Sequence, residues 1–106
     1  MKSIVTHHVS IERFDRIEYI IDTIGLGDEV ILEAMLPNAE NVMRRMQITN
    51  TGVLLVKALD DDILVTAWIA KMDQAIRICR SAGRIRMPDS LYRRIQQNKK
   101  YADRQP

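Results

Sequence analysis

At 106 residues the chain has room for one domain, and its 46% hydrophobic content is that of an ordinary folded protein. No apolar run reaches the roughly 18 residues that a membrane-spanning helix requires, and the N-terminus lacks the apolar core of a secretory signal. A single cysteine leaves no internal disulfide, and one cysteine with two histidines argues against a structural zinc site. We therefore expect a cytoplasmic protein that holds no metal or other cofactor and does not enter a membrane.

The net charge of +2 conceals an asymmetry along the chain. Residues 1–70 contain 6 Lys/Arg and 11 Asp/Glu, a net charge of −5, whereas residues 71–106 contain 10 Lys/Arg and 3 Asp/Glu, a net charge of +7. Such a separation is typical of a basic surface that meets an anionic partner. The alternative is that the basic residues only keep a terminal helix soluble.

The first predicted helix begins after Ser10, a good N-cap residue, and ends at Gly25, a typical left-handed cap. Residues 2–9 before it are partly β-branched and are expected to be extended. Apolar residues at spacings of three and four predict one buried stripe along this helix: Ile11, Phe14, Ile17, Ile20, Ile21 and Ile24. Arg13 and Arg16 are three residues apart and share a helix face. Arg16 is expected on the side away from the apolar stripe.

Four segments with strand character follow the first helix. They are "GDEVILEAML" (27–36), stopped by Pro37, then the weaker "VMRRMQIT" (42–49), "VLLVKAL" (53–59) and "ILVTAWIA" (63–70). Turn signals at 50–52 and 60–62 separate the later segments and favour an antiparallel meander. The last two segments are nearly continuous in apolar residues, which suits strands covered on both faces or central strands packed by helices. Trp68 is predicted to be a core or edge anchor.

After Ala70 the apolar period becomes helical. A second helix carries the buried small hydrophobe Cys79 and ends at Gly83, and a third has Pro88 in its first turn. Residues 103–106 are expected to fray. We therefore predict an α+β domain with an N-terminal helix, an antiparallel three- or four-stranded meander and two C-terminal helices. The helices at the two ends are expected to pack on one face of the sheet.

Two resemblances accompany this order of elements. The segments "TGVLLVKALDDDILVTAWIA" and "RMPDSLYRRIQQNKKY" resemble small uncharacterised proteins carried by prophages and mobile elements of Gram-positive bacteria. One N-terminal helix followed by an antiparallel meander is also similar, distantly, to the RelE-like and barnase-like ribonuclease toxins. The second resemblance implies RNA cleavage without metal by mixed sets of His, Arg, Lys, Glu, Tyr and Thr side chains.

Metal-free RNA cleavage requires a base, an acid and cations aimed at the phosphate. Imidazole titrates near neutral pH, which suits His7 or His8 to proton transfer. Arginine and lysine would hold the phosphate, and a hydroxyl would donate to it. The candidate catalytic set is His7, His8, Arg16, Arg45, Lys57 and Thr66.

Each member of this set also has a structural explanation. The histidines are ordinary solvated residues of a terminal segment, and Arg16 is within pairing distance of Glu12 or Glu18 on a helix. Lys57 marks the exposed side of its own strand, and Arg45 is expected on the neighbouring strand. Thr66 is a good strand former.

Basic residues are concentrated on the last two predicted helices: Arg77, Arg80, Arg84, Arg86, Arg93, Arg94, Lys99 and Lys100. Only Tyr92 and Tyr101 are interleaved with them, which favours contact with a phosphate backbone over reading of bases. An acidic protein is the alternative partner. The sequence contains no Gly-rich phosphate loop and no nucleophile elbow. We therefore predict a protein that binds an anionic partner, nucleic acid or acidic protein, with a metal-independent ribonuclease as the alternative.

Overall fold

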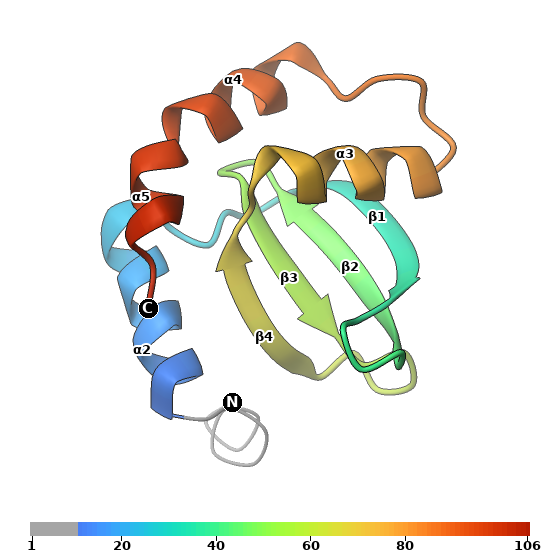
Figure 1. The fold of residues 1–106 in the computed structure, drawn as a ribbon, viewed down its shortest axis with the longest axis horizontal. Helices are drawn as coiled ribbons and strands as arrows, with labels where there is room; N and C mark the ends of the chain where they lie inside the picture. The colour runs from blue at the N-terminus through green and yellow to red at the C-terminus, as the bar shows by residue number, and fades with distance from the viewer. Residues whose placement is uncertain (1–10) are drawn as a thin grey trace.

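A four-stranded antiparallel sheet forms the centre of the molecule, and helices lie along two of its sides (Figure 1). The computed structural model describes residues 11–106, with side chains from Phe14 onward. The elements follow in the order α2 (Ile11–Thr23), β1 (Val30–Pro37), β2 (Met43–Thr49), β3 (Val53–Lys57), β4 (Leu64–Ile69), α3 (Met72–Ser81), α4 (Asp89–Gln97) and α5 (Lys99–Arg104). The strands lie in sequence order, so the predicted α+β class and the antiparallel meander are confirmed. No helix within these residues is long and apolar enough to cross a bilayer.

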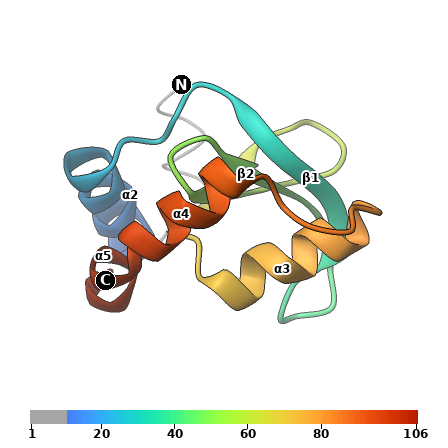
Figure 2. The same ribbon diagram turned by 90° about the horizontal axis from the view of Figure 1, so that it is seen from above.

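Helices cover both faces of the sheet, because the central strands are apolar on both sides. Alternate residues of β3 belong to two separate apolar clusters. Leu54 and Val56 pack with residues of α3 and α4, whereas Val53 packs with residues of α2 and α5. Figure 2 shows α3 along one side of the sheet. Helices α2 and α5 lie together at the end of the molecule away from β1. The expectation that the helices at the two ends pack on one face was therefore wrong, and cover on both faces was one of the two alternatives that the last two strands had left open.

Two glycines with positive φ shape the connections. Gly25 has a φ of 76°, and its N–H donates to Ile20 O at 2.8 Å, so it ends α2 as the sequence predicted. Gly52, with a φ of 89°, lies in the turn between β2 and β3. A Cβ at this position would lie 2.6 Å from Nδ2 of Asn98, because that side chain donates to Thr51 O at 2.8 Å. The turn thereby holds the C-terminal helices against the sheet.

The C-terminal part differs from the prediction in two ways. The predicted third helix is divided at Asn98, a buried residue between α4 and α5. Residues 103–106, expected to fray, are instead attached to the edge strand β4. Ile69 N donates to Gln105 Oε1 at 2.8 Å, and Gln105 Nε2 donates to Ile69 O at 3.1 Å. A polar side chain thus satisfies backbone groups that an edge strand would otherwise expose.

Candidate functional site

Arg16 is an internal anchor rather than a surface cation. Its side chain is only 4% exposed, so the prediction that it lies away from the apolar side of α2 was wrong. Nε donates to Ala67 O at 2.8 Å, Nη2 donates to Thr66 Oγ1 at 2.7 Å, and Nη1 donates to Pro106 O at 3.1 Å. The guanidinium carbon also lies 3.4 Å from the centre of the Trp68 ring. Helix α2 runs beside the edge strand β4, whose outward carbonyl groups require donors.

The helical stripe of α2 is narrower than its sequence suggested. Ile17 and Ile20 are buried as predicted, whereas Phe14 and Ile21 are largely exposed. The helix therefore presents a mixed face to the sheet, in which Arg16 lies beside the two buried isoleucines. Periodicity of apolar residues does not show this, because it treats every arginine as solvated.

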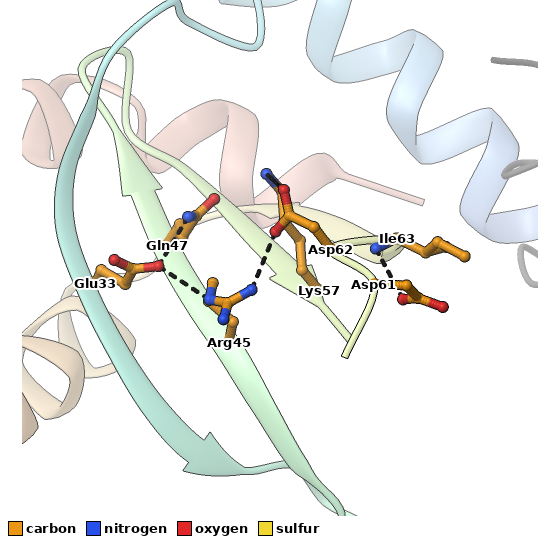
Figure 3. Close-up of polar contacts among 7 residues, drawn as sticks. All are labelled: Glu33, Arg45, Gln47, Lys57, Asp61, Asp62 and Ile63. Carbon is orange, nitrogen blue, oxygen red and sulfur yellow. Dashed lines mark hydrogen bonds and ion pairs between the residues drawn. The ribbon is translucent and has the colours of Figure 1, made fainter. Parts of the chain in front are cut away.

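Arg45 and Lys57 meet across β2 and β3, and this prediction is confirmed by their register. Both contact Asp62, which the sequence placed only in a solvated turn. Arg45 Nη1 lies 3.2 Å and Lys57 Nζ 3.6 Å from the Asp62 carboxylate, and Arg45 Nε lies 3.2 Å from Glu33 Oε2 (Figure 3). Gln47 Nε2 donates to the same Glu33 oxygen at 3.0 Å. Two carboxylates thus balance the two cations.

Asp62 has a left-handed backbone conformation, with a φ of 60°, in the turn that brings its carboxylate to these strands. The neighbouring Asp61 accepts a hydrogen bond from Ile63 N at 3.2 Å, which fixes the turn before β4 begins (Figure 3). Two of the three aspartates therefore stabilise the structure: Asp61 through the turn and Asp62 through its ion pairs.

The described members of the candidate catalytic set form two separate pairs. Thr66 is the strand partner of Val56, which packs under α3, so Thr66 projects from that face. Arg45 precedes Met46 of the same cluster and therefore projects from the opposite face, together with Lys57. Arg16 donates a hydrogen bond to Thr66, which joins these two residues as the first pair. His7 and His8 lie outside the described residues, as do Ser10, the extended segment 2–9 and the side chain of Arg13.

The eight basic residues that the sequence predicted to meet an anionic partner are all exposed. Three of them have close partners. Arg86 pairs with Asp89 at 2.9 Å, Lys99 pairs with Asp103 at 2.9 Å, and Arg77 Nη2 donates to Pro37 O at 3.3 Å. The hydrogen bond from Lys99 lowers the pKa of Asp103 below its ordinary value. The other five form no ion pair with any residue described, and we call them the unpaired basic set: Arg80, Arg84, Arg93, Arg94 and Lys100.

The charge separation in the sequence is preserved in the fold. Among the residues with described side chains, no ion pair joins a cation of residues 71–106 to an acid of residues 14–70. The two acids of the earlier segment that form ion pairs, Glu33 and Asp62, are bound to Arg45 and Lys57. The C-terminal helices therefore keep most of their positive charge available to a partner.

A cleft that the sequence did not reveal opens between α3 and the sheet. Its volume is about 800 Å³, and its lining comes from β1 to β4, α3 and the two loops before β2 and β4. Arg44 lines it, with Nε buried and without a hydrogen-bond partner among the described residues. The adjacent arginines of β2 thus serve opposite faces of the sheet, Arg44 the cleft and Arg45 the ion-pair network. The period of two in a strand was the one signal for this division.

A smaller hollow of about 380 Å³ lies between α3 and the start of α4. Cys79, Met87 and Tyr92 line it, with Arg80 and Arg86 among its polar neighbours. Cys79 is buried, as predicted for a small hydrophobe. Within the described part of the chain no group of three or more His, Cys, Asp or Glu side chains is placed to hold a metal ion.

The chain matches no family model, no curated protein and no solved structure. The resemblances to mobile-element proteins and to ribonuclease toxins therefore stay predictions.

Proposed function

We propose that this chain is a small binding protein, of the kind carried by prophages and mobile elements, that docks against nucleic acid through the unpaired basic set. The observation that carries this proposal is the absence of acidic partners for these five cations among the described side chains. Exposed cations without acidic partners remain available to phosphate, and the counterions condensed on the nucleic acid are released when these cations bind it.

The arrangement of the helices supports an extended contact rather than a pocket. The set comes from α3, α4 and α5, with Arg84 just beyond α3, and α4 contacts both of its neighbours. On α4, Leu91 and Ile95 are buried in the core. At 100° per residue Arg93 therefore points away from the core, whereas Arg94 lies at the side of the helix. Four of the five cations are arginines, whose planar donors suit phosphate oxygens.

Backbone contact without base reading is the binding mode that these residues favour. Tyr92 and Tyr101 are the aromatic residues of this region, and Tyr101 is already packed beside α2 and beneath Lys100. Few rings remain for stacking on unpaired bases. We therefore expect affinity for the phosphate backbone with little dependence on sequence.

No observation favours the ribonuclease alternative over this proposal. Arg45 and Lys57 are balanced by carboxylates on one face of the sheet, and Arg16 is committed to β4. A phosphate at either place would have to displace existing partners. The described cations of the candidate catalytic set thus offer no ready phosphate site for cleavage.

Fluorescence anisotropy with labelled 20-nucleotide DNA and RNA, single- and double-stranded, tests the proposal. At 50 mM NaCl we expect binding that the Arg93→Glu/Arg94→Glu variant weakens by more than tenfold. The matched control is Arg45→Gln/Lys57→Gln, which removes two paired cations from the sheet and should leave the affinity within twofold. Equal binding by wild type and Arg93→Glu/Arg94→Glu would reject the proposal. Binding of polyglutamate without binding of any nucleic acid would instead assign the surface to an acidic protein.

A further inference from the structure

The cleft between α3 and the sheet has the size of a small-molecule site. Its volume of about 800 Å³ falls in the range of roughly 300–1,000 Å³ that such sites occupy. The floor is apolar and comes from β2, β3 and β4, with Met46, Leu54, Val56 and Trp68 among its residues. These side chains sit on rigid strands, so the floor is formed before any ligand arrives.

Arg44 supplies an unsatisfied charge at this floor. Its Nε is buried and has no hydrogen-bond partner among the described residues. Arg44 forms no ion pair with any described residue, so an anionic ligand in the cleft would supply its missing counter-charge. A carboxylate is suited to this role, because its two oxygens can accept from the two Nη groups of one guanidinium in parallel.

A second arginine belongs to the same end of the cleft. Arg44 is the strand partner of Leu36, and Arg77 of α3 donates to the carbonyl of the next residue, Pro37. Arg77 is therefore already committed, and Arg44 is the cleft arginine without a partner among the described residues. The apolar floor extends from this end toward Trp68, the strand partner of Leu54.

The charges at the rim limit the ligand to one negative charge. Two arginines line the cleft, but so do three exposed carboxylates: Glu40, Asp61 and Asp73. These acids repel a dianion or a polyanion such as nucleic acid, whereas one carboxylate on Arg44 is neutralised. We propose that the cleft binds a small amphipathic monocarboxylate, with its carboxylate on Arg44 and its apolar body over Met46, Leu54 and Trp68. This site is independent of the unpaired basic set.

The full chain carries its own reporter, because Trp68 is the single tryptophan and lines the cleft. Its fluorescence is followed during titration with decanoate and with 4-phenylbutyrate, below any micelle concentration, and with decan-1-ol as the neutral analogue. We expect saturable one-to-one binding of at least one carboxylate, and at least tenfold weaker binding of the alcohol. Arg44→Gln should weaken carboxylate binding by tenfold or more and leave the response to the alcohol unchanged. Arg45→Gln, the neighbouring arginine on the opposite face, should bind as wild type does.

The absence of saturable binding by both carboxylates would overturn the proposal and assign water to Arg44. Equal carboxylate affinity in wild type and Arg44→Gln would also overturn it. Amide chemical shifts of the wild-type protein give a readout that needs no variant. Decanoate should shift Leu54, Val56 and the Trp68 indole N–H. Shifts confined to the hollow around Cys79 and Tyr92 would place the ligand elsewhere and contradict the assignment.

Discussion

The guanidinium of Arg16 lies 3.4 Å from the centre of the Trp68 ring. It also donates to the carbonyl of the preceding residue, Ala67, at 2.8 Å. One side chain of the first helix thereby contacts the backbone, the hydroxyl of Thr66 and the indole of the edge strand. A third hydrogen bond, to Pro106 O, connects the end of the chain to the same guanidinium. Arg16 is therefore the link between α2, β4 and the end of the chain.

Replacement of Arg16 tests this link. Arg16→Met keeps an unbranched apolar stem but leaves Ala67 O and Thr66 without their donors. We expect the free energy of unfolding to fall by about 2–4 kcal/mol, from lost charged hydrogen bonds and the lost cation–π contact. Arg16→Lys should recover only part of this, because an ammonium lacks the planar fork. Urea unfolding followed by far-UV circular dichroism measures the change.

The control for this substitution is Arg93→Met on the exposed side of α4, which should stay within about 0.5 kcal/mol of wild type. Arg16→Met and Arg93→Met unfolding at the same urea concentration would contradict the anchoring role.

The pair of hydrogen bonds between Gln105 and Ile69 protects the edge of β4. Gln105→Ala leaves one N–H and one C=O of the strand unpaired, and we expect a loss of about 1–2 kcal/mol of stability. The opened edge should also promote self-association, because an unpaired strand edge is a template for another chain. Urea unfolding and sedimentation velocity check the two effects. Gln97→Ala, at an exposed position of α4, should change neither.

Gly52 and Gly83 form a matched pair for the contact between the β2–β3 turn and the C-terminal helices. Both have positive φ, 89° and 77°, but a Cβ at Gly83 meets nothing within 4 Å. Gly83→Ala should cost about 1 kcal/mol from backbone strain alone. Gly52→Ala adds a clash with Asn98, which is 3% exposed, and should cost about 2–4 kcal/mol in total. Thermal unfolding compares them, and equal losses would show that Asn98 moves aside freely.

Asp62 links two cations, and its charge can be removed with little change in shape. Asn tolerates the left-handed backbone that Asp62 adopts, so Asp62→Asn isolates the electrostatic contribution. The carboxylate is more than half exposed, and we expect a loss of only about 0.5–1 kcal/mol. The loss should shrink in 1 M NaCl, because salt screens exposed pairs. Asp60→Asn, at a position without an ion pair in the described structure, should have no measurable effect at either salt concentration.

Local signals in the sequence predicted the elements, because strands and helix ends depend on neighbouring residues. The apolar runs that became β3 and β4 and the cap at Gly25 are of this kind. Burial of Arg16 was not predictable from its helix, because it depends on the unpaired edge of a strand fifty residues later. The anchoring of Gln105 has the same origin.

The placement of Arg44 and Arg45 on opposite faces of the sheet was predictable in part. A period of two in a strand places adjacent side chains on opposite faces, so the sequence implied that the two arginines separate. Which arginine would meet a cleft and which would meet acids required the register with β1, β3 and the Asp62 turn. The cleft itself depends on where α3 crosses the sheet, and no local pattern encodes that position.

The salt dependence of nucleic-acid affinity tests most directly whether the unpaired basic set contacts phosphates. If all five cations do so, a plot of log K against log [NaCl] should fall with a slope of about −4 to −5 for duplex DNA. Arg93→Gln/Arg94→Gln should make the slope shallower by about 2, with Arg45→Gln/Lys57→Gln unchanged. A wild-type slope near zero, or a slope that the Arg93→Gln/Arg94→Gln variant shares, would contradict the account.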